Sequence, residues 1–264
     1  MLELWKLANK YYQEGNFGPL EVFFLCKMTF MCNNKVEITP FLCYTLPKDR
    51  KMKAKEVYET LLQRFGNRGC ELNFNNNYQL LVAVILSARC TDKRVNIITK
   101  DLFEHYKTPQ DLANANIDEL QKEIYSCGFY RNKAKNLVLM AKDLCDRFGG
   151  VVPSNYQDLV SLAGVGRKTA NVVMYVGFGI PAIAVDTHVF RVSNRLSLVN
   201  AKTPLECELA LQKQMDKSSW GSFHHLLVLF GRYVCTSRSP ACVDCEFRTK
   251  CPYYKSKRGL RNNK

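Results

Sequence analysis

Residues 162–170 read L-A-G-V-G-R-K-T-A and place a tight turn between two helical patterns, at 156–162 and 168–177. Gly164 and Gly166 can adopt positive φ angles and let the backbone approach a ligand closely. The first N–H groups of the second helix lack helical acceptors and carry positive partial charge, so an anion is expected to bind there. The stretch predicts a helix–hairpin–helix that holds a phosphate through backbone amides, with an ordinary helix–turn–helix corner as the alternative.

Lys168 lies at the mouth of this turn, beside the positive end of the second helix. That position disfavours an ammonium ion and favours a neutral amine, which is a nucleophile that can form a Schiff base with a sugar aldehyde carbon. Asp186 lies in the stretch V-D-T-H-V-F-R at 185–191 and precedes a further helical pattern, so it is expected to cap that helix. A capping carboxylate can still project into a cleft, which makes Asp186 the candidate companion of Lys168.

Four cysteines near the C-terminus follow the pattern C-x6-C-x2-C-x5-C: Cys235, Cys242, Cys245 and Cys251. Four thiolates this close can enclose one metal centre, either zinc or an iron–sulfur cluster. Zinc sites usually show two short knuckles, and only one is present here, so the spacing favours a cluster. The pattern also differs from the ferredoxin run, which argues against electron transfer as the sole role. Buried reduced thiols are the remaining alternative.

The composition indicates a folded, basic protein. The chain has 264 residues, of which 47% are hydrophobic, and a formal net charge of +14. Such an excess fits a polyanion such as nucleic acid, whose phosphates release counterions when Lys and Arg displace them. The sequence shows neither an apolar run of membrane-spanning length nor the features of a signal peptide. Its twelve cysteines are therefore expected in a reducing compartment, free or bound to metal.

The pattern is helical from Lys53 onward. Apolar residues recur at three- and four-residue steps over 54–65, and the nearly all-apolar run 78–88 predicts a buried helix. Further helices are expected at 93–105, 117–125, 132–148, 187–196, 204–214 and 223–233. We find no alternating strand pattern, so the sequence predicts an all-α fold. Residues 1–51 show no long helical pattern and so differ from the rest of the chain. They are either an added segment or the result of a start assigned too early, in which case Met52 is the true first residue.

Together these features resemble the endonuclease III family, the iron–sulfur DNA glycosylases of base-excision repair. The resemblance covers residues 53–257 and also rests on L-S-A-R-C-T-D at 86–92, V-D-T-H-V-F-R-V at 185–192, H-H at 224–225 and G-R-Y at 231–233. It implies a two-domain helix–hairpin–helix DNA glycosylase fold whose C-terminal loop holds a 4Fe–4S cluster through the four cysteines. A six-helix domain would span 70–180, the cluster domain would combine 52–69 with 181–258, and 259–264 would form a basic tail.

The resemblance also implies the chemistry. Lys168 takes the place of the family's nucleophile, and Asp186 that of its assisting carboxylate. The expected activity is a bifunctional DNA glycosylase and AP lyase, which removes oxidised pyrimidines and cuts the strand by β-elimination. The alternatives are a monofunctional mismatch glycosylase and a non-catalytic DNA-binding iron–sulfur protein. A monomer is expected to bind double-stranded DNA with a damaged pyrimidine or an abasic site, with no membrane, in the cytoplasm beside a bacterial nucleoid or in a eukaryotic nucleus.

Further DNA contacts are implied at Arg89, at Phe129 and at six hairpin positions: Leu162, Gly164, Val165, Gly166, Arg167 and Thr169. Arg89 stands where the family commonly has Gln, and Phe129 where it has an apolar wedge such as Leu. These side chains fill the gap left by a flipped nucleotide. Arg89 is expected to change the preference for the opposite base, since it can donate to guanine acceptors. For Phe129 the alternative is core packing. The other residues weighed are expected in the core, the histidines alternatively at phosphates: His188, His224, His225, Cys90, Cys127, Cys145 and Cys207.

Overall fold

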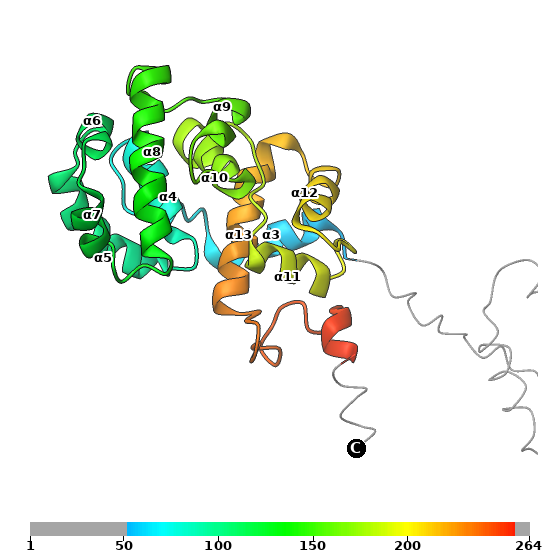
Figure 1. Cartoon of the computed structure of the whole chain (residues 1–264). Coiled ribbons are helices and arrows are strands. Elements are labelled where there is room, and N and C mark those ends of the chain that lie inside the picture. Colours follow the sequence, from blue (N-terminus) through cyan, green and yellow to red (C-terminus); the bar gives the residue numbers. More distant parts are fainter. Residues whose placement is uncertain (1–51, 257–264) are drawn as a thin grey trace, which may run out of the picture. The chain divides into compact units, whose positions relative to one another are not determined.

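The computed structural model describes residues 52–256, which belong to one unit (Figure 1). No residue in that range forms a strand, and this confirms the predicted all-α class. The expectations for residues 1–51 and for the tail at 259–264 lie outside the described residues. The helices are α3 (Ala54–Phe65), α4 (Asn77–Ser87), α5 (Asp92–His105), α6 (Pro109–Ala113), α7 (Ile117–Glu123), α8 (Tyr130–Phe148), α9 (Tyr156–Ser161), α10 (Arg167–Phe178), α11 (Thr187–Arg195), α12 (Pro204–Gln212), the 3-10 turn η1 (Lys217–Ser219) and α13 (Trp220–Tyr233).

Side-chain caps explain where many of these helices begin. Asn76 accepts a hydrogen bond from the backbone N–H of Gln79, and Thr91 accepts one from that of Arg94. The short helix α6 was not predicted, although the sequence contains the residues that start it. The Thr108 side chain accepts a hydrogen bond from the backbone N–H of Asp111, and the Asp111 carboxylate accepts one from the backbone N–H of Thr108. Pro109 occupies the first turn. Within residues 52–256, every helix is too short or too polar to span a lipid bilayer.

Two hydrophobic clusters form the interior. The first draws on residues between Leu72 and Val173 and surrounds α4, whose residues 78–86 are all buried. The second joins residues 52–61 to residues 183–251, with Phe223 and Phe230 of α13 among its fully buried side chains. Accordingly α10 packs against α4, while α13 packs against α3 and α11 (Figure 1).

Two arginines tie the clusters together. Arg232 of α13 forms ion pairs with Glu71 and with Asp92, the latter at the start of α5 and at 2.8 Å. Arg167 of α10 forms an ion pair with Glu208 of α12. The helix that carries Lys168 is thereby held to the second cluster as well as to its own.

Candidate active site at the start of α10

The turn before α10 is built on one glycine and two buried anchors. Leu162 and Val165 are only 2% and 6% exposed, so a ligand could meet only their backbone. Gly164 has φ 77°, and a Cβ there would lie 2.9 Å from the Cβ of Asn136, so only glycine fits. Gly166 instead has φ −93°, and a Cβ there would meet nothing within 4 Å. The expectation of positive φ therefore holds for Gly164 and is wrong for Gly166.

Gly166 directly precedes the first amides of α10, and the space that a Cβ there would occupy is open. Gly166 is the N-cap residue and offers no side-chain cap, so these N–H groups are left for another acceptor. No neighbouring group in residues 52–256 would clash with a side chain at position 166, so packing does not explain the glycine. The arrangement suits an anion, such as a phosphate, that approaches the backbone directly.

This difference predicts opposite effects for two alanine substitutions. Gly164→Ala should lower the free energy of unfolding by at least about 1–2 kcal/mol, because it adds left-handed strain to a close contact. Gly166→Ala should change it by less than about 0.5 kcal/mol but weaken DNA binding, because its methyl group holds a phosphate away. Urea denaturation and fluorescence anisotropy with duplex DNA measure the two effects. Equal affinity of Gly166→Ala and wild type would count against a phosphate at this turn.

Lys168 follows in the first turn of α10 and is exposed. Its ammonium makes no hydrogen bond or ion pair with any residue in the described range. Thr169, next in the helix, is half-buried. Lys168 therefore lies at the positive end of a helix, as the sequence predicted, and the structure adds that its amine has no partner among residues 52–256.

The segment that leads to Asp186 returns along α10 after Gly179, which has φ 67°. The returning segment is fixed by Asn171, whose Nδ2 donates to the carbonyl of Ile183 at 2.9 Å. Asp186 follows three residues after this anchored carbonyl. Lys168 and Asp186 form no ion pair within 4.0 Å, so neither charge is neutralised by the other through a direct contact.

Asp186 caps α11, as predicted, and does so with one oxygen. Its Oδ1 accepts hydrogen bonds from the backbone N–H groups of His188 and Val189, at 2.9 and 2.8 Å. Its Oδ2 accepts none from residues 52–256. The carboxylate is thus oriented by one oxygen, while the other stays available for chemistry.

Two adjacent histidines of α13 underlie this region. His224 is 4% exposed, so it lies in the core, which was one of the two locations predicted for it. Its Nδ1 has no hydrogen-bond partner within the described part of the chain. Burial lowers the pKa of His224 to about 3, with smaller contributions from His225 and Lys168. Burial also lowers the pKa of His225. Both rings are therefore neutral in the folded protein at neutral pH.

The low pKa of His224 predicts an acid-sensitive fold. The unfolded chain protonates this ring below its ordinary pKa of about 6.5, whereas the folded chain does not. The unfolded state thus binds more protons, and stability falls as the pH drops from about 6.5 toward 3. Thermal melts at pH 7.5 and pH 5 should show a smaller drop in midpoint for His224→Leu than for wild type. If the midpoint fell equally in both proteins, a group other than His224 would be the main cause of the acid sensitivity.

Arg89 and Phe129 form an exposed pair. Both have left-handed backbones, with φ 54° and 61°. The Arg89 guanidinium carbon lies 5.4 Å from the centroid of the Phe129 ring, and Phe129 is 61% exposed. The core-packing alternative for Phe129 is therefore wrong.

Lys133 holds this pair in place, and sequence reasoning missed it. Its side chain is 6% exposed, and its Nζ donates to the carbonyls of Leu86 and Ala88, at 2.8 and 2.6 Å. Burial lowers the pKa of Lys133. Because Lys133 lies in the first turns of α8, just after Phe129, these bonds tie the Phe129 loop to the Arg89 loop. Its sequence signal is weak, since a lysine in a helix is normally solvated.

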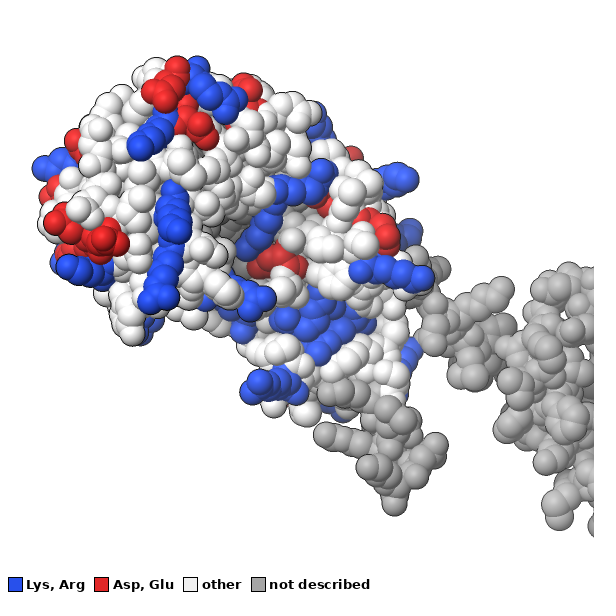
Figure 2. Space-filling model, viewed as in Figure 1, with Lys and Arg blue, Asp and Glu red and all other residues white. Residues whose placement is uncertain are grey.

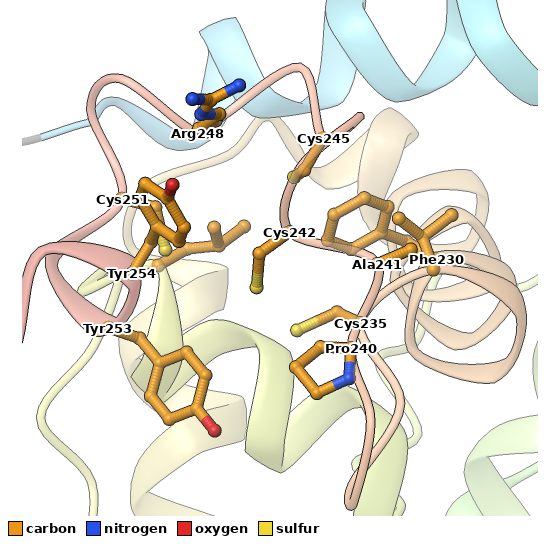
Figure 3. A pocket seen from close by; sticks show the side chains of 12 residues that line it. Phe230, Cys235, Pro240, Ala241, Cys242, Cys245, Arg248, Cys251, Tyr253 and Tyr254 are labelled. Atoms are coloured by element: carbon orange, nitrogen blue, oxygen red, sulfur yellow. The ribbon is translucent and has the colours of Figure 1, made fainter. Parts of the chain in front are cut away.

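Cys235, Cys242, Cys245 and Cys251 line one pocket, and Figure 3 shows their side chains around a common space. Arg195 donates to the sulfur of Cys235 at 3.5 Å, and its guanidinium lies 4.1 Å from the Tyr253 ring centroid. In the range 52–256, no three Cys, His, Asp or Glu side chains converge closely enough to hold a single ion. Four cysteine thiols that line one pocket are the kind of donor set that a four-cysteine metal centre uses.

The comparisons with known proteins agree with this geometry. A family model described as "HhH-GPD superfamily base excision DNA repair protein" matches residues 82–217. The chain is 50% identical to the endonuclease III of Bacillus subtilis over 188 residues, which are 71% of this chain and 86% of that protein. The chain belongs to the endonuclease III family.

Other members of the endonuclease III family show the same likeness. The Rickettsia conorii endonuclease III is 43% identical, over 75% of this chain and 95% of that protein. A trapped covalent endonuclease III–DNA intermediate, an estranged-adenine complex, is similar with a TM-score of 0.76 and 43% identity, covering 78% of this chain and 99% of that one. A thermostable thymine-DNA glycosylase is similar with a TM-score of 0.68 and 28% identity, covering 77% of this chain and 97% of that one.

As a member of the endonuclease III family, the protein is a base-excision-repair DNA glycosylase with AP lyase activity. This confirms the predicted family and activity over the two alternatives. Its surface suits a polyanion: Figure 2 shows Lys and Arg side chains spread over one face of the described unit, around a hollow.

Proposed function

We propose that the enzyme removes oxidised pyrimidines from double-stranded DNA through a Schiff base at Lys168. One observation carries this proposal: Lys168, in the first turn of α10, is exposed and has no hydrogen bond or ion pair among residues 52–256. Asp186 supports it, because it follows shortly after the carbonyl that Asn171 of α10 holds and keeps its Oδ2 free. The unfilled space at Gly166 supports a phosphate held beside them. Damaged pyrimidines leave the base stack at lower cost than intact ones, which favours them as substrates.

The proposed chemistry assigns a role to each of the two side chains. The neutral amine of Lys168 attacks C1′ of the flipped nucleotide, the N–C1′ bond forms, and the glycosidic bond breaks as the base leaves. The C1′–O4′ bond then breaks as the nitrogen loses a proton and O4′ gains one, which opens the sugar ring and leaves an imine between Lys168 and C1′. The imine acidifies the C2′ proton, and removal of that proton expels the 3′ phosphate. Asp186 either takes the proton from the Lys168 ammonium or stabilises positive charge at the sugar, and then relays protons. Without Lys168 only water could attack, and strand cleavage would be lost.

We also propose that Cys235, Cys242, Cys245 and Cys251 hold a 4Fe–4S cluster. Their arrangement around one pocket supports this assignment. A cluster at this place would supply structural order to a loop that has little regular structure of its own. Ion pairs from this loop to α3, Lys250 with Glu56 and Arg64 with Glu246, would then be held in register.

The two-domain division is part of the same proposal. The first hydrophobic cluster falls within the six-helix domain proposed at 70–180, and the second within 52–69 and 181–258. Lys168 then comes from the first domain and Asp186 from the second. The proposed partner is duplex DNA bound by a monomer, with Arg89 and Phe129 entering the gap beside the flipped nucleotide.

Three duplexes test the proposed substrate class, carrying thymine glycol, a G·T mismatch or an A·G mismatch. We expect base release and strand cleavage with thymine glycol and neither with the mismatches, and a 3′ unsaturated aldehyde end that marks β-elimination. Base release without cleavage would indicate a monofunctional enzyme. Binding without release would leave only a DNA-binding module. Iron and acid-labile sulfide analysis tests the cluster, and four iron atoms per chain are expected.

A further inference from the structure

Arg167 directly precedes Lys168, and its guanidinium, although its side chain is 44% exposed, contacts two side chains of the protein. Its Nε and Nη2 donate to Oε2 and Oε1 of Glu208, both at 2.8 Å, so the contact is bidentate. Its Nη1 donates to the hydroxyl of Tyr156 at 3.2 Å, and the guanidinium carbon lies 5.3 Å from that ring centroid. The planar, forked geometry that makes arginine suited to phosphate is thus already used for a carboxylate.

Glu208 needs this partner. It lies on α12 and is only 4% exposed, and an ionised carboxylate in such a place is costly without a paired cation. The remaining side-chain contact to it is a 3.5 Å hydrogen bond from Gln212, in the next turn of the same helix. The hydrogen bonds to Glu208 are also the main reason that the pKa of Arg167 is raised. The Arg167–Glu208 ion pair is therefore favoured over leaving Glu208 unpaired, and its two hydrogen bonds fix the orientation of both side chains.

The pair joins the two sides of the candidate site. Ala170 and Val173 of α10 belong to the first hydrophobic cluster. Cys207 and Leu211 of α12 belong to the second, as do Val185 and Val189 on either side of Asp186. The Arg167–Glu208 contact thus links the helix that begins with Lys168 to the cluster that carries Asp186.

We propose that Arg167 is a positioning residue, whose bidentate contact with Glu208 sets the gap across which Lys168 and Asp186 face the deoxyribose. The inference rests on the proposed roles of Lys168 and Asp186. It reassigns Arg167 from a phosphate contact to a strut, by which we mean a residue whose contact with Glu208 holds α10 and α12 at a fixed separation. A misplacement of about 1 Å between reacting groups can cost about 100-fold in rate, so loss of the strut should slow chemistry far more than binding.

Two variants separate a strut from a phosphate contact. Arg167→Gln and Glu208→Gln should both lower the single-turnover rate of base release, by roughly 10- to 100-fold, because each opens the same gap. Affinity for a duplex with an uncleavable abasic analogue, measured from low to high KCl, should keep its salt dependence in both. A phosphate contact would instead reduce the salt slope by about 0.9 in Arg167→Gln alone and leave Glu208→Gln unchanged. That result would overturn the proposal.

Further variants keep the test sharp if one protein is unstable. The double variant should be no slower than the slower single variant, because residues that act as one pair are not additive. Arg167→Lys keeps the charge but not the fork, so its rate should lie between wild type and Arg167→Gln. Glu206→Gln, an exposed glutamate on the same helix, should match wild type. Additive effects, or Arg167→Lys as slow as Arg167→Gln at an unchanged melting temperature, would count against a strut.

The failure of this inference differs from that of the proposed function. Borohydride trapping of wild type on an abasic duplex tests the Lys168 chemistry by itself. If wild type gives no adduct, the proposed function fails. If wild type gives the adduct and both Arg167→Gln and Glu208→Gln form it at the wild-type rate, only the positioning role fails.

Discussion

The Lys168→Gln protein is expected to form no borohydride-stable adduct with a duplex that contains an abasic site. Lys168 is the unengaged amine at the start of α10, and glutamine keeps its polarity without its nucleophilicity. Strand cleavage should fall by roughly 10⁴-fold or more, the scale on which removal of a covalent nucleophile acts in other enzymes. DNA affinity should change little, because only one charge is lost. Denaturing gels of the trapped complex, with anisotropy for binding, measure both.

The matched control is Lys142→Gln, which removes the same charge from an exposed lysine of α8. It should trap like wild type. A trapped adduct in Lys168→Gln would show that another amine is the nucleophile, and peptide mapping of that adduct would identify it.

Asp186→Asn should slow base release by about 10²- to 10⁴-fold, the range of a positioned acid or base, while the fold is kept. Asparagine caps helices about as well as aspartate, so the bonds to His188 and Val189 can persist through its side-chain oxygen. Only the charge and the free second oxygen are lost. Asp186→Ala should in addition lose about 1 kcal/mol of stability with the cap. Single-turnover kinetics and urea denaturation separate the two losses.

Asp118→Asn is the control for charge, since Asp118 lies in the first turn of α7 and is exposed. It should leave the rate unchanged. If Asp186→Asn were as fast as wild type, the carboxylate of Asp186 would be a helix cap and nothing more.

Local sequence rules predicted most of the helices and much of the candidate site. The hairpin, the cap at Asp186 and the buried α4 each follow from residues a few positions apart. The contacts that were missed are long-range. Arg167 and Glu208 are 41 residues apart, and Lys133 and Leu86 are 47 apart. Which acid or carbonyl such a cation reaches depends on how whole helices dock, and no periodicity encodes that.

The exposure of Phe129 was also beyond what local sequence patterns could predict. A large apolar side chain after a glycine is more often buried than exposed, and the sequence left the two places equal. The left-handed backbone at Phe129 turns the side chain outward against Arg89, 40 residues earlier in the chain. Backbone handedness at a non-glycine residue is set by its surroundings.

The second hydrophobic cluster joins the first described helix to the end of the chain, and this sets an order for assembly on the ribosome. The cluster around α4 closes within residues 72–173, so it can form while the rest is being made. Val57 and Leu61 of α3 must wait for Phe223 and Phe230 of α13. At about 5–20 residues per second, that wait lasts roughly ten to thirty seconds. During synthesis the apolar face of α3 therefore stays without its partner helix until α13 has been made.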